Sequence, residues 1–180
     1  MRHEPIDHEV SDLMKKATAE TKEGNYVLAI ELVKKSLNKI KKSNLLYSHS
    51  SYTKIIPYYQ KAGLYSEVEK FCLDELVPSI RVAFQNGMSQ RCQEIQEVHF
   101  YQYISKIYDK LRLAAKRESK PDDENRFIRE YAFYESKWKE LQPVAQKTEL
   151  AKEYKEMKKV FGADTSLWPD VIKNRFESLL

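Results

Sequence analysis

The chain has little of what flexible, disulfide-stapled or membrane-spanning proteins need. Only four of its 180 residues are glycine, which argues against a low-complexity chain. No apolar run approaches the ~20 residues that cross a bilayer, and residues 1–5 lack the apolar region of a signal peptide. The two cysteines, Cys72 and Cys92, lack CxxC spacing. We therefore expect reduced thiols and a cytoplasmic protein without membrane insertion.

The common signatures of enzymes and cofactor sites are also missing. The sequence contains no glycine-rich phosphate loop, no HExxH and no CxxC. His49 and His99 stand alone, with no serine or cysteine arranged beside them as a nucleophile. We expect a protein without catalysis, without a cofactor and without a functional metal site.

What is present favours helices. Hydrophobic residues make up 42% of the chain and charged residues 32%, a balance that suits a helical protein with its own core. Apolar residues recur at i, i+3 and i+4, and no stretch alternates with period two for long enough to propose a strand. The fold class is predicted to be all-α. The expected helices cover about 7–23, 25–42, 48–63, 66–86, 89–118, 124–142, 144–161 and 166–180.

Two glycine turns organise these helices. Gly24 and Tyr26 open one amphipathic run, Gly63 and Tyr65 open another, and the glycines stand 39 residues apart. A glycine at a tight turn between antiparallel helices predicts helical hairpins, and this spacing is close to the period of helical solenoids. We expect two hairpins in 1–88. A long hairpin with capping helices is expected in 89–180, packed with the first part as one domain.

Residues 10–43 resemble the tetratricopeptide repeat, and residues 49–82 resemble a second, weaker copy. The match in the first copy rests on the residues that this family uses at the turn and the helix contact: Leu13, Ala17, Gly24, Tyr26, Ala29 and Leu37. The resemblance implies a short solenoid that binds a protein or peptide partner in a concave groove lined by the first helix of each repeat. The implied lining is Ser11, Met14, Thr18, Thr21, Lys22, Ser50, Thr53, Pro57, Gln60 and Lys61.

This lining is mostly small and neutral, and Met14 and Thr18 stand where some family members carry a Lys and Asn clamp for a terminal carboxylate. The resemblance therefore does not predict a chaperone-tail clamp. We expect salt-tolerant binding that rests on apolar contacts. Tyr101 and Tyr108 are the expected anchors, because exposed tyrosines suit protein interfaces.

Binding of RNA or DNA is the alternative. Two stretches carry the basic residues for it, and phosphate groups are the partners they would meet. These residues are Lys34, Lys35, Lys39, Lys41 and Lys42 in one stretch, and Arg112, Lys116 and Arg117 in the other. A lysine near a helix C-terminus is also favoured by the helix dipole, and a net charge of +4 needs no more than solubility to explain it.

Overall fold

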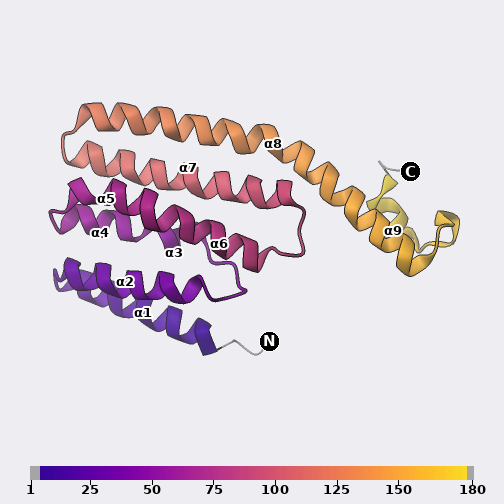
Figure 1. Cartoon of the computed structure of the whole chain (residues 1–180), viewed down its shortest axis with the longest axis horizontal. Coiled ribbons are helices and arrows are strands. Elements are labelled where there is room, and N and C mark those ends of the chain that lie inside the picture. Colours follow the sequence, from indigo (N-terminus) through magenta and orange to yellow (C-terminus); the bar gives the residue numbers. More distant parts are fainter. Residues whose placement is uncertain (1–4, 178–180) are drawn as a thin grey trace.

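The computed structural model describes the backbone of residues 5–177, and within this range the chain is helical and contains no strand. Antiparallel helices stack in successive layers from the N-terminal end to α8 (Pro121–Phe161) (Figure 1). A buried core runs without interruption from α1 to α8. No described helix is long and apolar enough to span a membrane. The last three residues of the predicted C-terminal helix, 178–180, lie outside the described range.

The first layer is a hairpin of α1 (Pro5–Lys22) and α2 (Tyr26–Ile40). Gly24 joins them with φ +83°, a conformation that side chains other than glycine's disfavour. Ala17 and Ala29 are fully buried, and small side chains at these positions let the two helices approach closely. The predicted turn and hairpin are confirmed.

The second layer is more broken than expected. Its first half comprises α3 (His49–Thr53) and α4 (Ile55–Lys61), and its second half α5 (Tyr65–Phe71), the π-helical turn η1 (Cys72–Leu76) and α6 (Val77–Gly87). Pro57 has no N–H for the carbonyl of Thr53, and the helical hydrogen bonding is interrupted at Lys54, although this residue keeps helical dihedrals (φ −54°, ψ −30°). The π-helical turn η1 ends shortly before Pro78. Proline has no N–H to donate, and the wider hydrogen-bond pattern of a π turn lets the chain continue as a helix past the missing bond. Gly63 (φ +74°) makes the turn between the halves.

Ser66 and Glu69 have the spacing of a capping box at the start of the second half, but they do not form one. The helix begins one residue earlier, at Tyr65, with no side-chain cap. The carboxylate of Glu69 instead accepts hydrogen bonds from both terminal nitrogens of Arg126, on α8. A charge-assisted bidentate pair is stronger than a neutral cap bond, so tertiary contact determines where this glutamate points.

The third layer pairs α7 (Gln93–Arg117) with α8 (Pro121–Phe161). Separate helices on either side of Pro143 were expected, but α8 is continuous through it. Pro143 and Lys139, whose carbonyl loses its donor, are both exposed, so water can satisfy that carbonyl. Beyond the layers α8 bends and extends away from the body (Figure 1).

The C-terminal segment folds back on this extension. It comprises the 3-10 turn η2 (Thr165–Leu167) and α9 (Asp170–Arg175), instead of the single helix expected from Ser166. Trp168 and Phe176 are buried and contact the ring of Tyr154 on α8. The indole nitrogen of Trp168 donates to the carbonyl of Gly162 at 3.1 Å. The segment thus has a small aromatic core of its own at the far end of α8.

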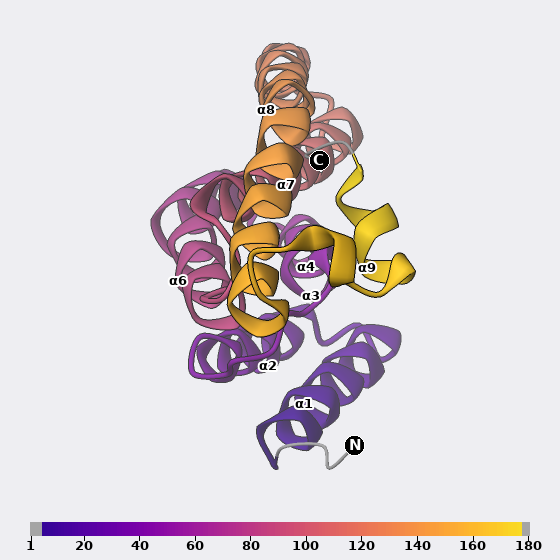
Figure 2. The same cartoon turned by 90° about the vertical axis from the view of Figure 1, so that its right-hand side faces the viewer.

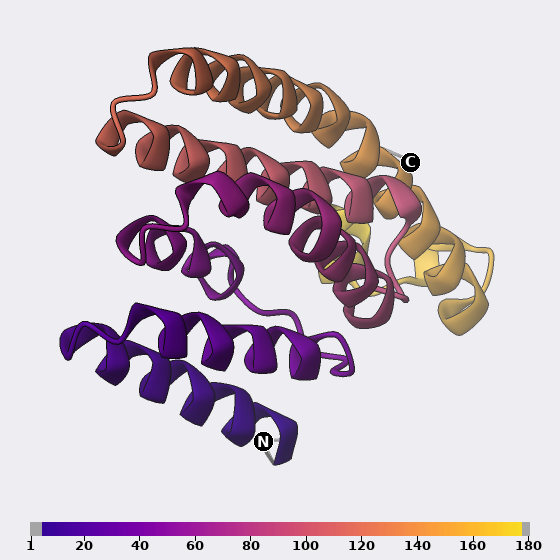
Figure 3. The ribbon, with the colours of Figure 1, turned by 60° about the vertical axis from the view of Figure 1, so that its left-hand side comes forward.

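Two sides of the molecule follow from this order. Viewed end-on, α1, α3 and α4 lie toward one side, and α2 and α6 lie toward the other (Figure 2). Viewed obliquely, the layers succeed one another from α1 and α2, through the short helices, to α7 and α8 (Figure 3). α4 packs against α2, α7 packs against α3 and α4, and Lys54, between α3 and α4, bonds to Thr18 of α1.

Candidate functional site

Two neighbouring hollows open along the first helices of the hairpins, with volumes of about 480 and 580 Å³. The smaller lies between α3, α4 and α7, and the larger between α1, α3 and the connection after α2. Met14, Ser51 and Lys54 line both. The two therefore form a single groove, here called the first-helix groove. No described residue of α8 or α9 lines it.

Helical periodicity explains why residues distant in sequence line this groove together. On α1 the groove residues Ser11, Met14 and Thr18 fall on one helix face, and Val10 and Ala17 point into the core beside them. The short helices of the second layer and the connection after α2 supply further lining residues. The full lining is Asp7, His8, Val10, Ser11, Met14, Lys15, Thr18, Tyr47, Ser50, Ser51, Thr53, Lys54, Pro57, Lys110, Leu113 and Arg117.

Part of the lining implied by the resemblance occurs in the groove and part does not. Ser11, Met14, Thr18, Ser50, Thr53 and Pro57 line it. Thr21, Lys22, Gln60 and Lys61 lie toward the other end of their helices and do not. The Thr21 hydroxyl donates to the carbonyl of Thr18 at 2.8 Å, and Lys22 is exposed at the end of α1. The Gln60 amide donates to Glu118 at 2.7 Å, and the Lys61 ammonium lies 5.5 Å from the centre of the Tyr26 ring.

The tyrosines expected as anchors face the other way. Tyr108 is buried and stacks on Tyr134 of α8 with a ring separation of 5.6 Å, and burial raises its pKa to about 12. Tyr101 also contacts Tyr134, at 6.0 Å. Neither lines the first-helix groove. They lie on the face of α7 that pairs with α8, which the helical stripe alone did not separate from the groove face.

The groove face of α7 was missed by the sequence analysis. Lys110, Leu113 and Arg117 line the smaller hollow, and Lys106 lines a further small hollow next to His49 and Tyr103. Positions 106, 110, 113 and 117 share one helix face. Lys106, Lys110 and Arg117 recur at helical spacing on a face outside the apolar stripe of α7, a signal that was legible in the sequence.

Lys54 was also missed by the sequence analysis. Its ammonium donates to the hydroxyl oxygen of Thr18 at 2.6 Å and to the carbonyl of Met14 at 3.3 Å. Both partners are neutral, and no ion pair with a carboxylate forms among residues 7–177. Burial lowers the pKa of Lys54. This half-buried ammonium therefore has two neutral hydrogen-bond acceptors and no carboxylate to compensate its charge.

The groove is consequently basic rather than neutral. Lys54, Lys110 and Arg117 line its smaller hollow, where no carboxylate is present among the lining residues. In the larger hollow Asp7 accepts a hydrogen bond from the Tyr47 hydroxyl, and Lys15 lies 3.8 Å from Asp12. The expectation of salt-tolerant binding loses its basis, because it assumed a lining with few charges.

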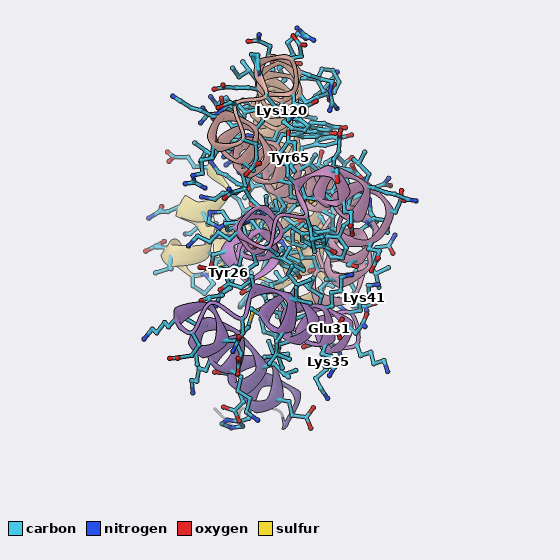
Figure 4. The ribbon with its side chains drawn as sticks, turned by 90° about the vertical axis from the view of Figure 1, so that its left-hand side faces the viewer. Tyr26, Glu31, Lys35, Lys41, Tyr65 and Lys120 are labelled. Atoms are coloured by element: carbon cyan, nitrogen blue, oxygen red, sulfur yellow. The ribbon has the colours of Figure 1, made fainter. Side chains whose placement is uncertain are left out.

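The basic residues named for nucleic acid do not form one surface. Lys35 and Lys41 lie on the α2 side, away from α1, whereas Lys120 marks the distant turn after α7 (Figure 4). Several are occupied locally. The Lys34 ammonium lies 4.9 Å from the centre of the Phe71 ring, Lys39 pairs with Glu9, and Arg112 pairs with Asp109 at 2.8 Å. Lys42 and Lys116 are exposed, and Arg117 alone of the eight lines the first-helix groove.

The arrangement provides binding groups rather than a nucleophile with its base. The Lys54 ammonium bonds to Thr18 and not to Ser50 or Ser51, and the Thr18 hydroxyl donates to the carbonyl of Met14 on its own helix at 2.8 Å. A serine activated by lysine requires a direct hydrogen bond between them. No cluster of three metal-ligating side chains occurs within the described part of the chain.

Comparison with family models, with curated proteins and with solved structures finds no match for this chain. The groove and its residues therefore carry the functional argument.

Proposed function

We propose that the chain is a non-catalytic helical-repeat adaptor, with hairpins arranged as a short solenoid like that of tetratricopeptide repeats. It would hold an extended segment of a partner protein in the first-helix groove. The observation that carries the proposal is that Met14, Ser51 and Lys54 line both hollows. They join the first helices of three successive hairpins into one continuous groove.

The size and lining of the groove fit a peptide. Packed helices lie about 8–10 Å apart, so three helices in a row present roughly 20 Å of surface. An extended chain covers that length with about six residues. Met14, Pro57 and Leu113 supply apolar contacts, and Ser50, Ser51 and Thr53 carry hydroxyl groups for the backbone polar groups that an extended peptide leaves unpaired.

Binding of RNA or DNA ranks second. Its basic residues are divided between α2 and the end of α7, and many are held by local acids or rings. The apolar members of the smaller hollow are aliphatic, and Tyr47 is the one tyrosine among the lining residues of the larger hollow, whereas proteins that hold single strands use several aromatic side chains on which successive bases stack.

The test is a selection from random peptides about 12 residues long, which span roughly 40 Å when extended, on the immobilised full chain. Selected peptides are then titrated against Ser51→Trp, which places a large side chain where the two hollows meet. Ser66→Trp is the matched control, because Ser66 is an exposed helical serine on α5 that lines neither hollow.

We expect Ser51→Trp to abolish binding and Ser66→Trp to retain it, with both variants folded by circular dichroism. A selection that enriches no peptide would overturn the proposal. Peptides that bind both variants equally would overturn it as well, because they would bind outside the groove.

A further inference from the structure

We infer that the segment held in the first-helix groove is acidic, with carboxylates that meet Lys54, Lys110 and Arg117. Its apolar side chains would pack on Met14, Pro57 and Leu113. This inference rests on the proposed function and adds the chemistry of the ligand. Three observations support it: the state of Lys54, the basic face of α7, and the absence of acids from the lining of the smaller hollow.

Lys54 supports the inference most strongly, because a half-buried cation without a counter-ion lowers the stability of a folded protein. Its ammonium has only the Met14 carbonyl and the Thr18 hydroxyl as partners, and burial lowers its pKa. Its position where the two hollows meet makes it accessible to whatever occupies the groove. A ligand carboxylate at this point would supply the missing charge.

The basic face of α7 extends this site. Lys106, Lys110 and Arg117 lie along about 16 Å of one helix face, at 1.5 Å per residue. None of them forms an ion pair within the described residues, whereas Arg112 on the adjoining face pairs with Asp109. The helix dipole favours a cation at Arg117, at the end of α7, but it does not account for Lys106 or Lys110 farther from that end.

The distribution of acids gives the groove a direction. The hollow between α3, α4 and α7 contains three cations and no carboxylate, and Asp7 lines the groove at its α1 end. Complementary charge steers association and fixes register. The acidic part of the segment should therefore lie against α7, with the less acidic part toward α1.

A peptide fits this surface better than a nucleic acid does. The carboxylates of a peptide come with aliphatic and aromatic side chains, which match the apolar contacts offered by Met14, Pro57 and Leu113. A single strand brings a phosphate with every base, and each base needs a flat stacking partner. No aromatic residue is among those that line the smaller hollow.

The experiment uses the peptides selected on the full chain and compares their net charge with that of the unselected library. We expect enrichment of Asp and Glu. The selected peptides are titrated against the double variant Lys110→Glu and Arg117→Glu. Its control is Lys35→Glu with Lys42→Glu, which makes the same change in net charge on exposed residues of α2 and of the segment just after it.

The groove variant should weaken binding by about tenfold or more, and the control should change it by less than about twofold. Replacing Glu by Gln in the best peptide should produce a loss comparable to that in the groove variant. If the charge reversal impairs folding, Lys110→Gln with Arg117→Gln provides the same comparison.

Each other outcome has a distinct meaning. Neutral or basic peptides that still depend on Ser51 would overturn the acidic ligand and leave the adaptor standing. Failure to select any groove-dependent peptide would overturn the adaptor and this inference with it. A single-stranded oligonucleotide that binds in place of peptides, and loses affinity in the groove variant alone, would assign the groove to nucleic acid and overturn both.

Discussion

The ammonium of Lys54 lies 2.6 Å from the hydroxyl oxygen of Thr18 and so joins the second layer to α1. The contact crosses the floor of the first-helix groove, since both residues line it. Its partners are neutral and its pKa is lowered by burial. We interpret Lys54 as a residue kept for binding rather than for stability, and this interpretation has a direct test.

Lys54→Met should leave the free energy of unfolding within about 0.5 kcal/mol of the parent or raise it, because methionine keeps an unbranched apolar stem and removes an uncompensated charge. The Thr18 hydroxyl still donates to the Met14 carbonyl, so the substitution orphans neither group. Urea denaturation measures the effect, and Lys35→Met on the exposed face of α2 is the control. A loss above about 1 kcal/mol would mean that the ammonium stabilises the fold through its hydrogen bonds.

Tyr52→Phe should stabilise the protein by about 1 kcal/mol, because the Tyr52 hydroxyl is buried without a hydrogen-bond partner among the described residues. The matched variant is Tyr103→Phe on the neighbouring ring, which lies 5.7 Å away. The Tyr103 hydroxyl donates to the carbonyl of Tyr47 at 2.7 Å, so its removal should cost about 1 kcal/mol. Thermal denaturation of the two variants should shift in opposite directions. A loss in both would show that the Tyr52 hydroxyl has a partner in solution.

Asp123→Asn should destabilise the protein near neutral pH by about 0.5–1 kcal/mol, since the group is partly exposed. Asp123 accepts from Tyr65 at 2.8 Å and from Arg126 at 3.0 Å, and these contacts lower its pKa. A carboxyl with a depressed pKa contributes stability above its unfolded pKa and loses it as the pH falls through the folded value. The difference between parent and variant should therefore shrink below about pH 4.

Asp122→Asn is the control for that measurement. Asp122 precedes Asp123 in the same first turn of α8, so both carboxylates meet the same helix dipole. Only Asp123 takes part in the network with Tyr65, Arg126 and, through Arg126, Glu69. An equal, pH-dependent loss in both variants would assign the effect to the dipole instead of to the network.

Gly24→Ala should cost about 1–2 kcal/mol, because the residue holds φ +83° and an L side chain is strained there. A Cβ at Gly24 would meet no atom within 4 Å, so the loss comes from the backbone and not from a clash. Gly24→Asn should lose less, since asparagine tolerates this region better. Equal losses in chemical denaturation would point to a contact of the glycine rather than to its conformation.

The features of this protein that could be predicted from its sequence are those that depend on single residues or on neighbours in the chain. Apolar residues at helical spacing predicted an all-helical chain, and Gly24 and Gly63 marked turns because a positive φ is a property of one residue. The resemblance to the tetratricopeptide repeat, rather than the periodicity, named Met14, Thr18 and Thr53 as groove residues, and these three line the groove.

Only the tertiary structure determines which neighbouring element each helix face contacts. Tyr101 and Tyr108 contact α8 because α7 offers one side to its hairpin partner and another to the groove, and spacing within α7 does not say which is which. α8 continues through Pro143, where Lys139 and Pro143 are both exposed and water can satisfy the carbonyl without a donor. Lys54 contacts Thr18, a residue 36 positions away, across the groove. Such a contact depends on how the layers pack. Packing results from many weak interactions between residues distant in the sequence, and no local sequence pattern encodes them.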